Sequence, residues 1–261
     1  MVSCGRLAAL NQLEYRFNLL SDTLIQPMVV GLTEVTLWMA FFATTGRAEL
    51  IGFSKEAYLA YAMWASFMAR VSTSWMYEFM MIEDVESGSV NSVLVRPISF
   101  YEYYLGQFLG YKIFTMGLSL SAPLLLTWYF GLPVDLARLP LALLLVLNYL
   151  ILVHTISFMI ASLGFFFTRI HHLTVAKNIT LWCLTGEFFP LDLTPDFIQR
   201  FLVNSPFAAG VFVPIGYMTG RHGLDAIGRS FVSVWIALLV LAPFAYWLWN
   251  AGRRRYSGTG A

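Results

Sequence analysis

The sequence predicts an all-α integral membrane protein: six transmembrane helices, an N-terminal interfacial amphipathic helix, and a re-entrant outward-facing helical hairpin before the last span. Two observations predict this class. Hydrophobic residues make up 58% of the 261 residues and charged residues only 12%, against about 25% charged in soluble domains. The mean hydropathy is +0.68, and the apolar residues gather in long runs. A soluble fold does not expose so much apolar surface, so lipid must cover it.

Six segments are expected to cross the bilayer, because a spanning helix needs about 20 mainly apolar residues. The fifth, 173–189, is weaker than the others because Lys177, Asn178 and Glu187 interrupt it. The whole chain, 1–261, forms one transmembrane domain, since the parts outside the spans are too small for a second. The other spans are clear apolar runs at 23–44, 58–80, 104–130, 140–167 and 231–250.

Positive charges place both termini in the cytoplasm. An even number of spans leaves the two termini on one side, and that side has a small excess of Lys and Arg. The run Arg253–Arg255 directly follows the last span, where the positive-inside rule has most weight.

Residues 5–20 are expected to form an amphipathic helix on the cytoplasmic surface of the membrane. Apolar side chains recur there at steps of three and four residues. A short helix packed on the protein itself is the alternative. The apolar positions are Leu7, Leu10, Leu13, Phe17 and Leu20.

The outward-facing stretch 190–220 is too apolar for a solvated loop and too rich in proline for one continuous span. Thr194 and Pro195 are expected at the N-cap and first position of a helix. We therefore expect two short helices that dip into the outer leaflet. Irregular backbone at that depth is tolerated only against protein or a water-lined cavity.

A polar stretch, ESGSVNSVLVRPISFYEYYLGQ at residues 86–107, begins after the second span and covers most of the cytoplasmic segment 83–103. Pro97 is expected to break the chain and Ser99 to cap the next helix. A short helix that ends in a proline turn is suited to docking a partner. An ordinary solvated connector is the alternative.

Several short stretches together resemble the ABC-2 type transporter permeases, in particular the bacterial subgroup often encoded as paired permeases. Glu-Ser-Gly at 86–88 is followed by Leu-Val-Arg-Pro-Ile-Ser at 94–99. Tyr15-Arg16 precedes the first span, and the stretch 186–195 and Ser-Pro-Phe at 205–207 follow in the expected order. The resemblance covers nearly the whole chain and rests on order and spacing around six spans.

This resemblance implies a type V exporter-like fold and a role as one half of an exporter in the bacterial inner membrane. The 83–103 segment would be the coupling segment that fits a cleft on a separate ATP-binding-cassette ATPase. Glu86, Gly88, Arg96 and Pro97 would lie in or beside that docking surface. ATP and Mg²⁺ would bind to the ATPase and no cofactor to this chain, which has no GxxxxGK[ST] phosphate loop. A second permease, a sister chain rather than another copy, would complete the pathway.

Two charged residues are predicted near the middle of the membrane. Glu34 in the first span and Arg70 in the second both lie roughly 15 Å deep at 1.5 Å per residue. An isolated charge there costs at least about 2.5–3.5 kcal/mol, so we expect them to pair. They would lie on the translocation path or at the subunit interface, or would be a purely structural link. Lys112 is expected to snorkel toward the cytoplasm.

His154 lies in the middle of the fourth span and is assigned to the path or interface, with a packing role as the alternative. Glu187, Phe188 and Phe189 end the fifth span. In the resembled family this region forms the outer gate, whereas an aromatic belt at the membrane surface is the general alternative.

Three classes of function compete. The permease subunit accounts best for the 83–103 segment. A proton- or ion-coupled secondary transporter that uses Glu34, Arg70 and His154 is the main rival, although such proteins usually show internal repeats. A membrane enzyme is disfavoured because the four histidines form no recognisable site. His171-His172 lacks a third metal ligand at suitable spacing. A net charge of +1 gives no general attraction to nucleic acid.

Overall fold

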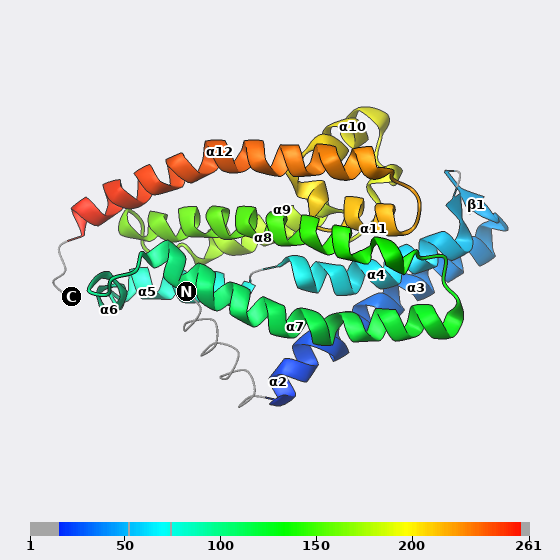
Figure 1. Cartoon of the computed structure of the whole chain (residues 1–261), viewed down its shortest axis with the longest axis horizontal. Coiled ribbons are helices and arrows are strands. Elements are labelled where there is room, and N and C mark those ends of the chain that lie inside the picture. The colour runs from blue at the N-terminus through cyan, green and yellow to red at the C-terminus, as the bar shows by residue number, and fades with distance from the viewer. Residues whose placement is uncertain (1–15, 52, 74, 257–261) are drawn as a thin grey trace.

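The computed structural model describes residues 16–51, 53–73 and 75–256. Its long helices run roughly along one axis (Figure 1). The short helix α6 (Asn91–Leu94) lies at one end of this bundle, called here the α6 end. The strands β1 (Glu49–Leu50) and β2 (Phe53–Ser54) form a small antiparallel hairpin at the opposite, hairpin end. Most of the helix predicted at 5–20 lies outside the described residues.

The helical elements follow one another with short connections. The first part of the chain forms α2 (Arg16–Leu20), the π-helical turn η1 (Ser21–Ile25), α3 (Gln26–Thr45), α4 (Lys55–Ser72), α5 (Trp75–Glu86), α6 and α7 (Phe100–Phe130). The second part forms η2 (Leu136–Arg138), α8 (Leu139–Ser162), η3 (Leu163–Phe165), α9 (His171–Thr185), η4 (Leu191–Leu193), α10 (Asp196–Asn204), η5 (Pro206–Ala209), α11 (Phe212–Met218) and α12 (Leu224–Arg255).

Four helical stretches in the described residues are long and apolar enough to cross a membrane: Phe17–Thr45, Phe100–Phe130, Leu136–Phe165 and Leu224–Arg255. They correspond to the first, third, fourth and sixth predicted spans. The third begins at Phe100 because Ser99 caps it, as predicted. Its hydroxyl accepts from the Glu102 amide, and the Glu102 carboxylate accepts in return from the Ser99 amide, which is a capping box.

The second predicted span, 58–80, is not one helix. α4 ends at Ser72 and α5 begins at Trp75, because Thr73 takes an extended conformation with φ −94° and ψ 157°. The end of α4 leaves backbone carbonyls without helical partners. Lys112 compensates, since its Nζ donates to the Arg70 carbonyl at 2.7 Å, where a cation also suits the helix dipole. Lys112 is 4% exposed, so the prediction that it snorkels is wrong.

The fifth predicted span, 173–189, is also shorter than expected. α9 has 15 residues and is therefore about 22 Å long, against a hydrocarbon core of about 30 Å. It ends at Gly186, whose φ of +82° is a left-handed conformation that favours glycine. Glu187, Phe188 and Phe189 therefore lie beyond the helix, in the connection to η4.

The 190–220 segment folds into two short α-helices, α10 and α11, as its broken pattern predicts. The predicted cap is displaced by one residue. α10 begins at Asp196 after Pro195, and the Thr194 hydroxyl instead donates to the Leu191 carbonyl at 2.6 Å. α11 packs against α4 and α8.

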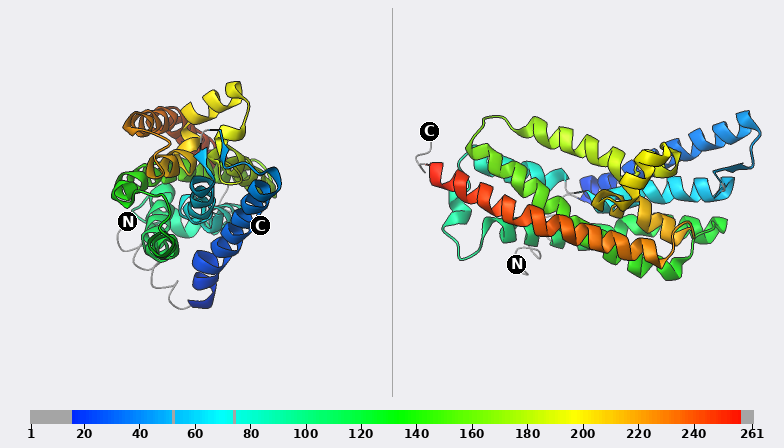
Figure 2. Two further views of the ribbon diagram at one scale, coloured as in Figure 1. Left: turned by 90° about the vertical axis from the view of Figure 1, so that its right-hand side faces the viewer. Right: turned by 90° about the horizontal axis from the view of Figure 1, so that it is seen from above.

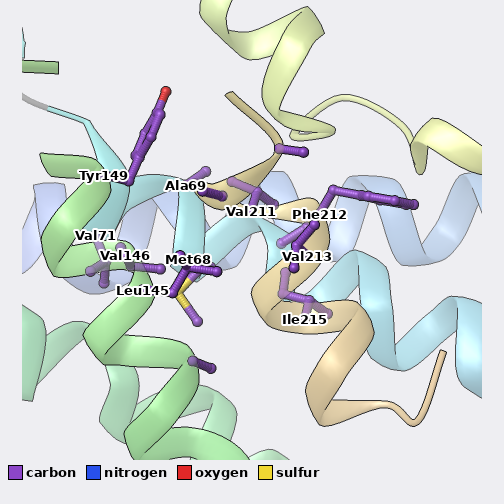
Figure 3. Packing of buried hydrophobic residues seen from close by; sticks show 14 of the residues in the cluster. Met68, Ala69, Val71, Leu145, Val146, Tyr149, Val211, Phe212, Val213 and Ile215 are labelled. Atoms are coloured by element: carbon purple, nitrogen blue, oxygen red, sulfur yellow. The ribbon is translucent and has the colours of Figure 1, made fainter. Parts of the chain in front are cut away.

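The core of the bundle has two parts. Near the hairpin end, α4, α8 and α11 pack together through residues such as Met68, Leu145 and Phe212 (Figure 3). Near the α6 end, Ile82, Phe108 and Trp249 belong to a second cluster.

α3 lies at the side of the bundle in both views of Figure 2. It packs along α4, and of its residues only Pro27, Gly31 and Phe42 are buried. Gly31 permits the close approach of the two helices, since a Cβ there would lie 2.6 Å from the Ser66 Oγ. The rest of α3 presents apolar side chains to its surroundings.

Candidate functional site

A cavity of about 670 Å³ lies between the start of the first long helix, the α4–α5 break, α7 and α9. Its size is in the range of ligand sites in proteins, about 300–1,000 Å³. Aromatic rings and a few charged groups line it, among them Asp22, Arg70, Tyr77, Glu83, Tyr111 and Trp182. The break in the second predicted span therefore forms part of the wall of a cavity.

Arg70 is positioned in this cavity by Asp22, not by Glu34. The Arg70 guanidinium lies 4.0 Å from the Asp22 carboxylate. The expected Glu34–Arg70 pair does not form among the described residues. Equal depth on neighbouring helices was the basis for that pair, and it does not fix which faces of the two helices meet.

Two smaller cavities, of about 90 and 10 Å³, continue the large one toward the hairpin end. Glu187 lines both of them. Thr73, in the α4–α5 break, and Trp182, on α9, line all three cavities. A polar surface thus runs from Glu83 past Trp182 to Glu187, with Thr73 and Trp182 where the cavity narrows.

Of the three residues predicted as the outer gate, Glu187 lines this narrow end, whereas Phe188 and Phe189 line none of the three cavities. The ring of Phe188 meets that of Trp182 edge-on, with centroids 5.7 Å apart. Phe188 is 51% exposed and Phe189 37% exposed. The role of Glu187, Phe188 and Phe189 as an outer gate stays a prediction.

The other two residues assigned to the path lie apart from the large cavity. Glu34, on α3, is partly buried and interacts electrostatically with Glu187. His154 is completely buried. Its Nε2 donates to the Tyr101 carbonyl at 3.2 Å, and its ring stacks on Phe108 with centroids 5.9 Å apart.

A buried carboxylate that we did not predict lies inside the bundle, in the half toward the α6 end. Glu78, on α5, is 1% exposed and forms an ion pair with Lys177 on α9. It also accepts from the Ser157 hydroxyl on α8 at 2.6 Å and from the Asn178 amide on α9 at 2.9 Å. One carboxylate therefore joins three helices. The sequence contained two signals for this cluster: Glu78 lies inside the second predicted span, and Lys177-Asn178 lies inside the fifth.

The 83–103 segment is fixed to two other parts of the protein. The Glu86 carboxylate accepts from the Ile170 amide at 2.8 Å and lies 3.2 Å from Nδ1 of His171, at the start of α9. The Gly88 carbonyl accepts from the hydroxyl of Tyr256 at 3.2 Å, just after α12. Glu86 and Gly88, predicted as docking residues, thus also hold the segment in place.

The remaining predicted docking residues, Arg96 and Pro97, are exposed. Between them and α6 stands Val95, a large apolar side chain that is 84% exposed. The inner side of the segment is anchored by Val90 and Val93, which are 0% and 1% exposed. The segment is a rigid, well-packed turn that presents an apolar residue and a cation at the α6 end.

The 190–220 segment is held by a second buried ion pair. Arg221 binds Asp192 at 2.9 Å, with side chains 1% and 9% exposed. The guanidinium lies 3.8 Å from the ring centroid of Phe53 and 4.6 Å from that of Tyr58, which is cation–π geometry. The neighbouring His222 is largely buried against Phe212, and this burial lowers its pKa below the ordinary value.

Comparison with known proteins identifies the family of the chain. No curated protein matches the sequence. The model of the family described as ABC-2 family transporter protein matches residues 28–260, which is nearly the whole chain. Together with the apolar helices, this match makes the chain a multi-pass membrane protein of a transport family. The protein belongs to the ABC-2 transporter family.

Proposed function

We propose that this chain is the permease subunit of an ATP-binding-cassette exporter in the bacterial inner membrane, with both termini in the cytoplasm. It forms half of the translocation pathway and couples, through the 83–103 segment, to a separate ATPase that binds ATP and Mg²⁺. The observation that carries the proposal is the link from Glu86 to the start of α9. The same helix carries Trp182 into the cavities.

The row of cavities supports half of a pathway. Its walls come from the first, second, third and fifth predicted spans. Apolar side chains of α3 such as Met28, Val29 and Leu32 are exposed beside it. A second permease on this side, a sister chain or another copy, would close the pathway and cover α3. The short helix α9 and the broken α4–α5 pair would still count as spans in this arrangement, because protein and cavity surround them.

Coupling then has a direct physical route. An ATPase that moves the 83–103 segment pulls on the Glu86 carboxylate, which holds Ile170 and His171. A shift of α9 moves Trp182 relative to Thr73, where the cavities narrow. Packed elements with two arrangements can amplify such small shifts.

The docking surface is centred on Val95 at the α6 end. Val95 is 84% exposed, so its side chain is accessible to a partner at the tip of the segment. Arg96 and Pro97 flank it. On this proposal the segment is a docking site and not a solvated connector.

Co-purification with the ATPase tests the proposal. We would isolate the tagged chain from its native membrane in mild detergent, as wild type and as Val95→Asp. The matched control is Ile51→Asp, the same chemical change at a residue 54% exposed at the hairpin end. We expect wild type and Ile51→Asp to retain an ATPase and Val95→Asp to lose it. If no ATPase co-purified with the wild-type chain, the proposal would be contradicted.

A secondary transporter that uses Glu34, Arg70 and His154 has less support. Proton transfer between these three side chains would need a chain of hydrogen bonds that connects them. Arg70 pairs with Asp22, and His154 is enclosed by Tyr101 and Phe108. No described contact joins the three residues.

A further inference from the structure

A second cavity, of about 690 Å³, lies at the α6 end and is separate from the proposed pathway. It is a groove between the end of the 83–103 segment, the start of α7, α8 and the last part of α12. Its floor is aromatic. Phe100 stacks on Trp249 with ring centroids 4.7 Å apart, and Phe158 lies 5.1 Å from Trp249.

Two arginines from different elements line this groove, Arg96 beside Pro97 and Arg253 at the end of α12. Arg96 lies over the Tyr103 ring at 5.4 Å, and Arg253 donates to the Asn250 side-chain oxygen at 3.2 Å. Neither guanidinium has a carboxylate partner within the described part of the chain. Glu102 also lines the groove, but its carboxylate accepts hydrogen bonds from Ser99.

The groove is long enough to reach from a membrane surface into the hydrocarbon core. Its lining on α12 runs from Arg253 back to Ala242, eleven residues or about 16 Å along the helix. A charged end and an apolar end at this separation match an amphipathic molecule whose head lies at the membrane surface. A soluble protein partner could not reach the apolar end, because α12 is one of the four long apolar helices.

We propose that this groove binds an anionic phospholipid of the adjacent leaflet. Its phosphate lies between Arg96 and Arg253, and one acyl chain covers Phe100, Phe158 and Trp249. Basic pockets between membrane helices are suited to anionic head groups, and the volume fits a ligand site. A lipid bound here would join the end of α12 to the docking segment. Only the identity of the leaflet, the cytoplasmic one, rests on the proposed function.

Quenching of Trp249 by brominated lipid tests the site directly. The full chain is placed in phosphatidylcholine vesicles that contain a minor fraction of brominated phosphatidylglycerol or, separately, of brominated phosphatidylcholine. The contribution of Trp249 to the tryptophan fluorescence is the difference in signal between the wild type and Trp249→Phe, a variant that keeps an aromatic ring at this position. We expect phosphatidylglycerol to quench this component at lower mole fraction, and excess unbrominated phosphatidylglycerol to reverse the effect.

The arginine variants separate the groove from general surface charge. One arginine near the surface contributes about a fivefold preference for anionic lipid. Arg253→Gln is therefore expected to reduce the preference about fivefold, and Arg96→Gln/Arg253→Gln to reduce it by up to about 25-fold. The matched control, Arg254→Gln/Arg255→Gln, removes the same charge from the same helix end outside the groove and should reduce the preference clearly less than Arg96→Gln/Arg253→Gln.

Two results would overturn the proposal. Equal quenching by both brominated lipids in wild type would mean that the groove does not select an anionic head group. An equal loss in the control variant would mean that diffuse positive charge attracts the lipid. The assay contains no ATPase, so failure of the proposed function would not affect it. Brominated phosphatidylcholine also reports whether the arginine variants retain the fold.

Discussion

Two buried ion pairs hold the two ends of the bundle in different ways. Near the α6 end, Glu78 and Lys177 are 1% and 10% exposed, and hydroxyl and amide groups from α8 and α9 also bind the carboxylate. Near the hairpin end, Arg221 and Asp192 are 1% and 9% exposed, and the guanidinium lies against aromatic rings. Hydrogen bonds from polar groups therefore stabilise the Glu78 carboxylate of the first pair, whereas aromatic rings stabilise the Arg221 guanidinium of the second.

The difference follows from what each pair joins. Glu78 links α5, α8 and α9 beside the cavities, and α9 is the helix that moves in the proposed function. Arg221 and Asp192 join short segments to each other and to β2 and α4, and so hold the 190–220 segment on a rigid support. The first pair therefore joins helices that line the cavities, whereas the second fastens the 190–220 segment to β2 and α4.

Breaking the Glu78 pair should have the largest effect. Glu78→Gln leaves the Lys177 ammonium buried without its counter-charge, and loss of one partner of a buried pair costs about 3–5 kcal/mol. The free energy of unfolding, measured in detergent by denaturant titration, should fall by that amount. Glu78→Gln/Lys177→Gln should lose less than the sum of the single variants, because no unpaired charge remains.

The matched control for this prediction is Asp225→Asn, which removes an exposed ion pair with Arg229 on α12. Exposed pairs contribute little to stability. If Glu78→Gln behaved like this control, the carboxylate would not be the central link between the three helices.

Changing the cation at the hairpin end should have an intermediate effect. Arg221→Lys keeps the charge but loses the planar group that lies against Phe53 and Tyr58. Because arginine stacks on rings and lysine does so less well, we expect a loss of about 1–2 kcal/mol in the same titration. Arg138→Lys serves as the control, since Arg138 is partly exposed beside Asp135 and Tyr217. Equal effects at the two positions would contradict an aromatic enclosure for Arg221.

Weakening the link between the docking segment and α9 should leave stability nearly unchanged and affect coupling instead. Glu86→Gln keeps an acceptor for the Ile170 amide and loses only the carboxylate charge beside Nδ1 of His171, a side chain that is 42% exposed, so the stability should change by less than about 1 kcal/mol. We expect the ATPase to co-purify with this variant. The rate of ATP hydrolysis should change less on binding this variant than on binding the wild-type permease. Val95→Asp should instead lose the ATPase altogether. Full coupling in Glu86→Gln would show that force travels by another route.

Replacing His154 should have the smallest effect. It is a buried polar group without a charged partner, packed on Phe108 and bonded to a carbonyl. His154→Gln can keep that hydrogen bond, so we expect little change in unfolding or in the pH dependence of ATP hydrolysis by the complex. A lost pH dependence with the fold intact would favour proton-coupled transport over the ATPase-driven pathway.

The sequence could predict the long helices and some of their ends. Runs of apolar residues locate four long helices, and Ser99 followed by Glu102 identifies the start of α7. The break after Ser72 could not be predicted, because hydropathy continues across it and Thr73 is no strong helix breaker. The cavity wall, and the bond from Lys112 to the Arg70 carbonyl, depend on this break.

The polar contacts were harder to predict than the helices. Their equal depth in the membrane suggested that Glu34 pairs with Arg70. Depth does not determine the rotation of a helix about its axis, and Arg70 lies beside Asp22 instead. Glu78 and Lys177 each interrupt a predicted span and pair across 99 positions of sequence. Opposite charges that interrupt different spans indicate buried charged groups, but Glu34 and Arg70 gave the same signal without pairing, so the partner of each charge could not be predicted.

The central claim is that a pathway runs past Trp182 and opens by movement of α9. The most direct test places a single cysteine, Trp182→Cys, in a chain with Cys4→Ser and Cys183→Ser, together with its ATPase. A membrane-impermeant thiol reagent is applied from each side of the membrane, with and without trapped ATP. We predict labelling from the cytoplasmic side without nucleotide and from the outer side, or not at all, with ATP trapped. Labelling from the same side at the same rate in both states would contradict the account.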